Sequence, residues 1–313
     1  MVKKTPRILV ILNPNADRGH AREIAPKLKA LLNLNRNVGW VETSRPGDAI
    51  QLATQACKEG YDIVVAAGGD GTAQEVVNGL MACYEDGARS ALGLIPLGSG
   101  NDFAWMMGVV PGKRQPRDPR GLEQAIQRLT AGKTRVIDVG RVCEGDRCRY
   151  FCNGAGIGFD GVVNIESRKI AWARGFLMYA LGVLRTMVLY YRAPHTVLEL
   201  DDMRIEQPLM MISVANGRRF AGGFYVAPHA EVDDGYFDVC TVDKVSRPEM
   251  LALIPKFLNG TQVNNRHVRM ARARRVTVQC DEGFAVHVDG EVFSTASRRL
   301  VLEIVPRKLR VVV

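Results

Sequence analysis

The first 138 residues alternate short apolar runs with helical stretches. Runs with the length of buried strands are expected at residues 8–12, 39–42, 63–67 and 91–96. Helical stretches are expected at residues 22–34, 47–58, 72–84 and 121–130. Because strands that alternate with helices form parallel sheets covered by those helices, the pattern predicts an α/β N-terminal domain with a largely parallel sheet.

After residue 138 the pattern changes, because strand-like segments now follow one another with turn residues between most of them. These segments are expected at residues 149–153, 196–200, 209–215, 237–242, 275–280, 285–288 and 300–305. The succession predicts an all-β antiparallel sandwich as the C-terminal domain. We therefore expect one domain at residues 1–138 and a second at 139–305. The sequence leaves open whether the tail 306–313 returns to the first domain.

One segment of the second domain, residues 170–191, is strongly apolar. Arg174 and Arg185 interrupt it, which disfavours a transmembrane helix. Two compatible roles follow from its composition. The first role is a buried helix that packs on the sandwich. The second is an apolar wall for a lipid chain, with basic residues at its ends facing headgroups.

The composition is that of a globular protein with an excess of basic residues. Its 313 residues are 47% apolar and 24% charged, and the formal net charge is +9. Such a charge suits nucleic acid, an anionic membrane surface or a phosphorylated ligand. Because aromatic residues are not interleaved with the basic runs and no nucleic-acid motif is visible, we expect a membrane surface and no nucleic acid.

The N-terminus and the cysteines indicate the compartment. No apolar signal region with a cleavage site follows the N-terminus, so we expect a cytoplasmic protein. The seven cysteines are scattered without a Cys-x-x-Cys pair, and free thiols are the expected state. Cys143 and Cys148 stand where they could face each other across a hairpin that turns near Gly145.

The most informative loop, Gly68-Gly69-Asp70-Gly71-Thr72, joins an expected strand to an expected helix. Its glycines let the backbone approach a ligand closely, and the following helix directs unpaired N–H groups to the same place, which predicts a phosphate site. Asp70 puts an acid where an anion is expected, and this suits a divalent cation between the two or a role in the chemistry. The combination suggests a kinase. The alternative is a plain turn in which Thr72 and Glu75 form a capping box.

Two further polar loops follow apolar strands. Gly98-Ser99-Gly100-Asn101-Asp102 comes after the strand expected at 91–96, and Asn13-Pro14-Asn15 comes after the first strand. In a parallel sheet these strand ends lie along one edge, where ligands bind. We therefore expect the loops to hold one ligand together.

As a set, these motifs resemble the diacylglycerol kinase catalytic family, and within it the group of soluble bacterial lipid kinases with sphingosine kinase relatives. Further matches lie downstream at residues 153–160, 227–238 and 289–291. The resemblance spans nearly the whole chain and implies the two-domain fold shared by NAD kinases and diacylglycerol kinases.

The resemblance also implies a nucleotide site in the first domain, with ATP in the cleft between the domains. The contacts would come from residues of several loops: Asn13, Thr43, Gly69, Asp70, Gly71, Thr72, Ala73, Gln74, Glu75 and Ser99. A catalytic Mg²⁺ and its waters would be organised by Asp70, Asp102 and Asp138.

Two further roles are implied for the second domain. Glu291 would be the general base for the acceptor hydroxyl and Asp70 would also take part in catalysis. Without the resemblance, Glu291 reads as a solvated residue of a hairpin turn, and Asp289 is open between a turn role and a partner of the metal or base. A structural metal would be held by Glu231, Asp234 and Tyr236, although Glu231 and Val232 replace the more apolar pair usual in the family.

The leading hypothesis is an ATP- and Mg²⁺-dependent lipid kinase at the inner face of the membrane, with diacylglycerol as the first choice of acceptor and phosphatidic acid as product. One alternative is an NAD kinase-like phosphotransferase, which shares the Gly-Gly-Asp-Gly-Thr loop. The other is a non-catalytic module that binds nucleotide and a membrane, against which the set of acids argues. The sequence leaves the lipid and any homo-oligomer open.

Overall fold

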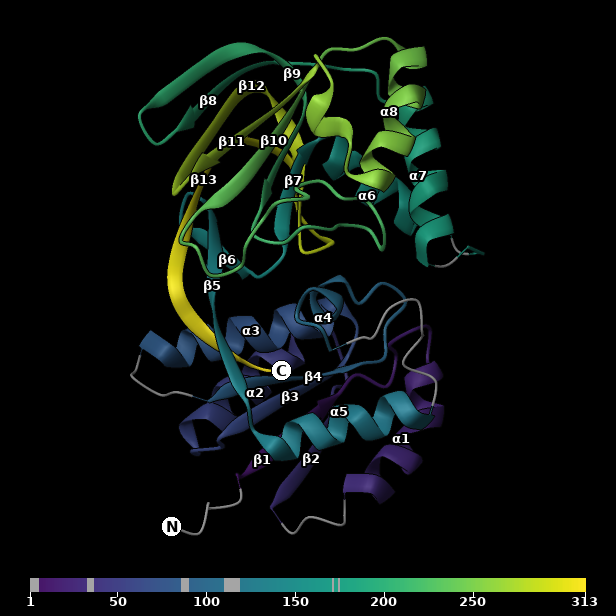
Figure 1. The fold of residues 1–313 in the computed structure, drawn as a ribbon, viewed down its shortest axis with the longest axis vertical. Coiled ribbons are helices and arrows are strands. Elements are labelled where there is room, and N and C mark those ends of the chain that lie inside the picture. Colours follow the sequence, from purple (N-terminus) through teal and green to yellow (C-terminus); the bar gives the residue numbers. More distant parts are fainter. Residues whose placement is uncertain (1–5, 33–36, 86–89, 110–118, 171, 174) are drawn as a thin grey trace. The chain divides into compact units, whose positions relative to one another are not determined.

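A computed structural model describes residues 6–32, 37–85, 90–109, 119–170, 172–173 and 175–313. The chain divides into two compact units (Figure 1). The first unit contains Met1–Ile137 and Lys308–Val313, so the last six residues of the tail 306–313 belong to it, and the second unit contains Asp138–Arg307. Arg174 and the last two residues of the helix expected at 22–34 lie outside the described residues.

The sheet of the first unit is built from the predicted apolar runs. Strand β1 (Ile8–Leu12) pairs in parallel with β2 (Val38–Glu42) and β3 (Ile63–Gly68), and β3 pairs in parallel with β4 (Ala91–Pro96). The C-terminal end of β13 (Glu291–Val312) joins them, since Val311 pairs in parallel with Leu92. Every residue of β3 and β4 is buried, as a strand between two layers of helices requires.

Helices α1 (His20–Leu32), α2 (Asp48–Lys58), α3 (Asp70–Glu85) and α5 (Pro119–Ala131) correspond to the predicted helical stretches. Leu28 of α1 and Leu129 of α5 pack in one core with β1, β3 and β4. Helices α2 and α3 cross so closely that a Cβ on Gly79 would collide with the carbonyl oxygen of Ile50. The short helix α4 (Asp102–Met106) was not predicted.

The second unit contains a largely antiparallel β-structure. Strand β12 (Arg275–Val288) pairs with β7 (Gly154–Gly158), β8 (His195–Leu200) and β13. Strand β9 (Met203–Ala215) pairs with β7, β8 and β10 (Phe237–Asp243), and β10 pairs with β11 (Val268–Ala273). Strand β5 (Thr134–Glu144) pairs with β6 (Arg147–Phe151) and also with β13. The segments expected at 275–280 and 285–288 are one strand whose register shifts between Gln279 and Phe284.

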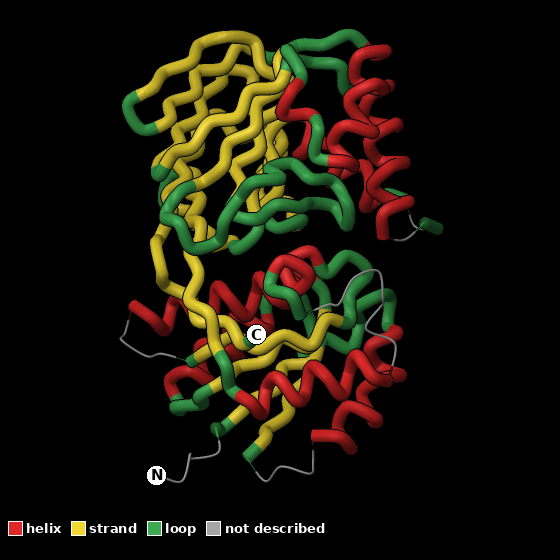
Figure 2. The backbone as a smooth tube through the Cα atoms, in the orientation of Figure 1, coloured by secondary structure: helices red, strands yellow, loops and turns green. Residues whose placement is uncertain are grey.

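The second unit also contains helices, so the prediction of an all-β domain was incomplete. The apolar segment forms α7 (Gly175–Leu189), whereas α6 (Phe159–Arg168) and α8 (Arg247–Asn259) were not predicted. Figure 2 shows these helices in red beside the yellow strands. None of the helices in the described ranges is both long enough and apolar enough to span a bilayer.

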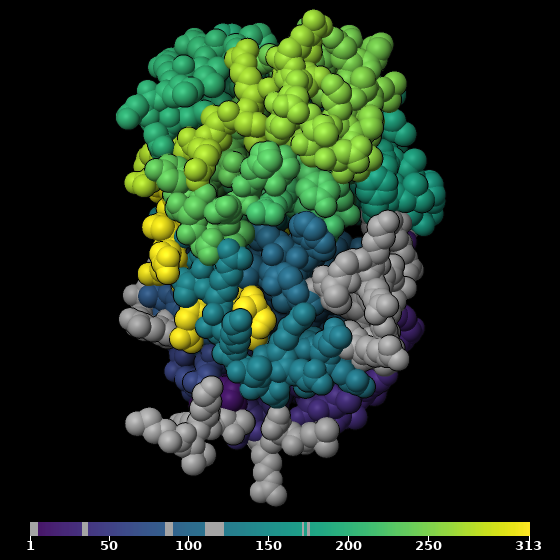
Figure 3. All heavy atoms as spheres, viewed as in Figure 1, coloured from purple at the N-terminus to yellow at the C-terminus, as the bar shows by residue number. Residues whose placement is uncertain are grey.

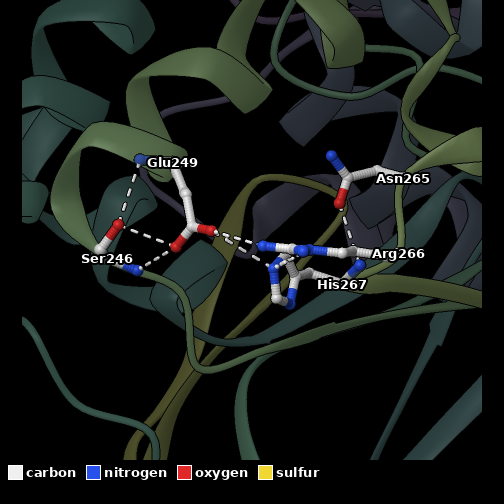
Figure 4. A network of polar contacts seen from close by, with 5 residues as sticks. All are labelled: Ser246, Glu249, Asn265, Arg266 and His267. Atoms are coloured by element: carbon white, nitrogen blue, oxygen red, sulfur yellow. Dashed lines mark hydrogen bonds and ion pairs between the residues drawn. The ribbon is translucent and has the colours of Figure 1, made fainter.

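The start of α8 is fixed by a polar network (Figure 4). Ser246 donates from its N–H to the Glu249 carboxylate (2.9 Å), and its hydroxyl oxygen accepts from the N–H of Glu249 (3.5 Å), which forms a capping box. The Ser246 hydroxyl also donates to the same carboxylate (2.8 Å). These bonds, with help from Arg266 and His267, lower the pKa of Glu249 to about 2. The network therefore connects the loop before β11, which contains Arg266 and His267, to the start of α8.

The basic run at residues 266–275 is largely neutralised within the second unit. Four of its five arginines pair with acids of neighbouring elements: Arg266 with Glu249, Arg269 with Asp243, Arg272 with Asp234 and Arg275 with Glu303. Most of the positive charge of this run is therefore paired with acids and does not add unpaired charge to the surface.

The expectation of free thiols was wrong for two cysteine pairs. The structure joins Cys57 to Cys83 and Cys143 to Cys148 as disulfides. Cys143 and Cys148 are directly paired residues of β5 and β6, so the hairpin itself brings their side chains together.

Candidate active site

The three polar loops of the first unit meet at one edge of its sheet, as the sequence predicted. The N–H of Asn13, after β1, donates to the carbonyl of Ala67 at the end of β3 (2.9 Å). The N–H of Leu97, after β4, donates to the carbonyl of Gly68 (2.7 Å). Asn13 also donates from its side-chain amide to the Thr72 hydroxyl (3.1 Å). Backbone bonds thus align the loops beside one another.

The glycine loops after β3 and β4 lie backbone against backbone. A Cβ on Gly98 would collide with the Cα of Gly69, so only glycines allow this approach. Asn101, in the left-handed region at φ +55°, closes the second loop. Its side chain accepts from the N–H of Gly98 (3.1 Å) and donates to the carbonyl of Gly98 (2.6 Å). The result is a side-chain-free cradle of the kind that accommodates phosphate.

Asp70 joins the two loops at the first residue of α3. Its carboxylate oxygens accept hydrogen bonds from the N–H groups of Asp102 and Phe103, both at 3.1 Å, and these residues open α4. Asp102 is buried next to this junction. The main chain therefore brings together two of the three acids that were predicted to organise Mg²⁺.

This donor set fits Mg²⁺ that arrives with a nucleotide. Mg²⁺ usually takes one or two protein carboxylates and completes its shell with phosphate oxygens and water. Each carboxylate oxygen has more than one lone pair, so Asp70 can accept further partners beside its two backbone bonds. Within the described ranges, no group of three or more His, Cys, Asp or Glu residues is placed to hold a metal ion. The fit is thus to an ion shared with phosphates.

The capping box predicted for Thr72 and Glu75 does not form, because α3 begins at Asp70. The Glu75 carboxylate instead accepts from the N–H groups of Gly47 (2.9 Å) and Ala49 (3.2 Å), at the start of α2. A half-buried acid at the N-terminus of another helix stabilises that end of its dipole. Glu75 therefore holds α2 against α3.

The other predicted nucleotide residues differ in what they expose. The side chains of Thr72, Ala73 and Gln74 are buried, so they leave backbone groups for a ligand. Ser99 is exposed at the tip of its loop. The N–H of Thr43 donates to the carbonyl of Leu12 (2.9 Å), which places Thr43 at the same edge of the sheet. Gly71 is half-buried in the first turn of α3. Their contacts with ATP stay a prediction.

In the second unit, Asp289 and Gly290 form the tight turn between β12 and β13. Both have positive φ angles (+46° and +80°), as a two-residue hairpin turn requires. The Asp289 carboxylate accepts from three consecutive N–H groups, those of Cys152 (2.9 Å), Asn153 (2.9 Å) and Gly154 (2.8 Å). Of the roles left open for Asp289, the structure supports the turn role.

Glu291 follows this turn and lies in an ion pair. Its carboxylate is 2.6 Å from the Arg168 guanidinium, and its side chain is 40% exposed. Arg168 (3.0 Å) and Asn164 (2.7 Å) also donate to the carbonyl of Gly290. Sequence reasoning missed both residues as parts of this site, although their spacing of four in one helix would place them on the same face. Glu291 is thus held by α6 rather than left solvated in a plain turn.

Asp138 belongs to the second unit and is fully buried. Its carboxylate accepts from the N–H groups of Gly235 (2.7 Å) and Arg307 (2.6 Å). These bonds give it a structural role where β5 enters this unit. Its part in a magnesium network stays a prediction.

The residues predicted for a structural metal are engaged with an arginine. Asp234 accepts from the N–H of Tyr236 (3.0 Å) and pairs with Arg272. The Arg272 guanidinium also lies 4.6 Å above the ring of Tyr236. The Asp234 carboxylate is therefore engaged by a guanidinium, and a structural metal held by this carboxylate with the backbone carbonyls of Glu231 and Tyr236 stays a prediction.

An apolar cavity lies between the sheet of the second unit and helices α6, α7 and α8. Its volume is about 100 Å³, and it opens to solvent. Its lining is almost entirely apolar: Phe159, Asp160, Val163, Tyr179, Val183, Met187, Met210, Met211, Phe220, Ala221, Phe224, Val226, Val242, Val245, Met250, Leu253, Ile254 and Phe257. Asp160 is the one acid in this lining. A cavity of this kind suits a hydrocarbon chain.

Two family models match the chain in succession. Residues 7–142 match the model described as the diacylglycerol kinase catalytic domain, and residues 154–313 match the YegS C-terminal NAD kinase beta sandwich-like domain. A diacylglycerol kinase of Bacillus subtilis is 30% identical over 91% of this chain and 89% of its own length. One from Mycobacterium tuberculosis is 28% identical over 91% of this chain and 88% of its own.

Solved structures share the fold. A diacylglycerol kinase from Bacillus anthracis superposes with a TM-score of 0.70 at 21% identity, over 99% of this chain and 97% of that one. An NAD kinase from Archaeoglobus fulgidus in complex with ATP gives 0.51 at 14% identity, over 98% and 93%. The structural similarity shows a shared fold, whereas the family models and the relative of Bacillus subtilis show the family.

Proposed function

Because the chain belongs to the diacylglycerol kinase family and is a kinase that acts on a hydroxyl acceptor, we propose that it transfers the γ-phosphate of ATP to a lipid hydroxyl. Diacylglycerol is the proposed acceptor and phosphatidic acid the product. The observation that carries the lipid acceptor is the apolar cavity, since α6 both lines it and holds Glu291. A dinucleotide acceptor has no hydrocarbon chain to fill such a space.

The residues divide the work as follows. The glycine loops around Gly69 and Gly98 and the first turn of α3 bind the phosphates through the backbone. Asp70 and Asp102 would hold Mg²⁺, which would supply positive charge to neutralise the phosphate oxygens. Glu291 takes the proton of the lipid hydroxyl. The hydroxyl oxygen then forms a bond to the γ-phosphorus, and the bond from that phosphorus to the leaving ADP oxygen breaks.

We expect labelled γ-phosphate to pass to diacylglycerol in mixed micelles with ATP and Mg²⁺, and not to NAD. Mass spectrometry over a panel with monoacylglycerol, phosphatidylglycerol and sphingosine identifies the acceptor. Leu253→Trp, which fills the cavity, should lower kcat/KM for a long-chain acceptor by about 10-fold or more. Leu251→Trp is the matched control, because Leu251 lies on the same helix, is 50% exposed and is not part of the lining.

Two results would contradict this function. Phosphorylation of NAD without any lipid product would establish the NAD kinase-like alternative. Nucleotide-dependent binding to liposomes without turnover of any acceptor would establish a non-catalytic module.

We further propose that the outer face of α7 lies on an anionic bilayer from the cytoplasmic side. Leu177, Leu184 and Val188 repeat on one face of this helix and are 53%, 46% and 71% exposed. Helix α7 is therefore apolar on its exposed face as well as on its packed face, and such an exposed apolar face is typical of a helix that binds a further apolar partner. Arg185, which pairs with Glu166, stands next to Leu184 on this helix, and the chain carries a net charge of +9, so anionic headgroups are the complementary partner. In Figure 3 the teal atoms of this region form part of the outer surface of the second unit.

Sedimentation with vesicles tests this surface. We expect binding to vesicles that contain phosphatidylglycerol, and a loss of about 10-fold or more in the partition coefficient for Leu184→Glu/Val188→Glu, because charge cannot enter the acyl region. Met203→Glu should leave binding unchanged, since Met203 is equally exposed (56%) but is the first residue of β9 and lies outside α7. Equal loss in both variants would exclude α7 as the docking face.

A further inference from the structure

Helix α6 lies along the end of β12 and the hairpin that follows it, and three residues of one helical stripe contact the hairpin in order. Asp160, Asn164 and Arg168 are spaced four residues apart, so they share one face of α6. The approach is close, because a Cβ on Gly161 would collide with the carbonyl of Ala285 in β12. Six of the ten residues of α6 are buried, Asn164 among them, so the polar groups of this stripe need hydrogen-bond partners.

Each residue of the stripe has a partner on the hairpin. Asp160 lies 3.4 Å from the Nε2 of His287, and its other oxygen accepts from the Ser213 hydroxyl (3.0 Å). Asn164 donates to the carbonyl of Gly290 (2.7 Å). Arg168 donates to the same carbonyl (3.0 Å) and pairs with the Glu291 carboxylate (2.6 Å). The stripe thus ends on the proposed general base.

The same helix forms part of the cavity wall. Phe159, Asp160 and Val163 line the cavity, so Asp160 belongs both to the lining and to the polar stripe. Tyr179 of α7, another lining residue, has its hydroxyl close to Gly290, within 3.7 Å of where a Cβ would stand. A movement of α6 caused by an occupant of the cavity would therefore be transmitted to the turn that carries Glu291.

We infer that α6 couples occupation of the cavity by a lipid chain to the placement of Glu291, with Asn164 and Arg168 as positioning residues. This inference rests on the proposed function. Binding energy of the distant chain is then used to orient the base, so a chain too short to fill the cavity lowers kcat as well as raising KM. An occupied cavity fixes α6, and α6 fixes the turn.

The test compares kcat for a long-chain and a short-chain diacylglycerol at saturating ATP. In the unaltered protein we expect kcat to be about 10-fold higher with the long chain, as expected when remote binding energy serves orientation. In Arg168→Gln and in Asn164→Ala this ratio should fall to about 1, because the turn no longer follows α6. Arg168→Lys, which keeps a cation near Glu291, should recover part of the ratio.

A merely structural role would lower the melting temperature and reduce both rates by the same factor, leaving the ratio unchanged. Lys169→Gln is the control, since Lys169 pairs with Glu166 and leaves the hairpin contacts intact. A ratio near 1 in the unaltered protein, or an unchanged ratio in Arg168→Gln, overturns the coupling while lipid phosphorylation stands. Absence of any lipid product overturns the function and the coupling together.

Discussion

Replacing Asp70 by asparagine is expected to abolish phosphoryl transfer while leaving the first unit folded. The asparagine oxygen can still accept one of the two backbone hydrogen bonds from Asp102 and Phe103, so the loops stay joined. The negative charge that would hold Mg²⁺ beside the phosphates is lost. Removing one such electrostatic contact from an active site costs about 10²–10³-fold in kcat, and we expect at least that loss for Asp70→Asn.

The measurement is kcat with ATP and Mg²⁺, with ATP binding by calorimetry at two Mg²⁺ concentrations and the melting temperature as a check on folding. Asp62→Asn is the matched control, because Asp62 precedes the opposite end of the same strand and accepts from the N–H of Arg7 (2.8 Å). It should change kcat by less than about 2-fold, within the range of ordinary surface substitutions. Full activity in Asp70→Asn would remove Asp70 from the mechanism.

The sheet edge of the first unit was predictable because its signal is local. Each apolar strand is followed directly by its loop, and parallel pairing alone then brings Asn13, Asp70 and Asp102 to one edge. The contacts of the second unit are not local. Asn164 and Gly290 are 126 residues apart, and Asp289 reaches the N–H of Cys152 across 137 residues. No spacing in one sequence specifies such partners.

The two capping-box patterns show the same limit in a single motif. Ser246 and Glu249 have the required spacing and form the box, whereas Thr72 and Glu75 have it and do not. Glu75 faces the start of α2, where two N–H groups compete for its carboxylate. The pattern shows that a capping box is possible at a helix start, and the contacts with the neighbouring element determine whether it forms. Read in the same way, Ser246 and Glu249 would have revealed α8 in advance.

Changing Glu291 to glutamine should lower kcat by about 10²–10⁴-fold with little change in KM, the effect expected when a general base is removed. The amide oxygen of glutamine still accepts from Arg168, and the bonds of Asn164 and Arg168 to the Gly290 carbonyl are untouched. The turn therefore keeps its shape, and the melting temperature should change little. What is lost is the capacity to take the proton of the acceptor hydroxyl.

Glu303→Gln gives the matched control for this variant. Glu303 lies on the same strand, pairs with Arg275 and is 40% exposed, as Glu291 is. Since the two glutamates differ in position and not in burial or pairing, the loss of activity should follow position alone. If Glu291→Gln retains full activity, water or another group takes the proton, and α6 holds a glutamate that has no part in the chemistry. If Glu303→Gln loses as much as Glu291→Gln, the effect belongs to the strand.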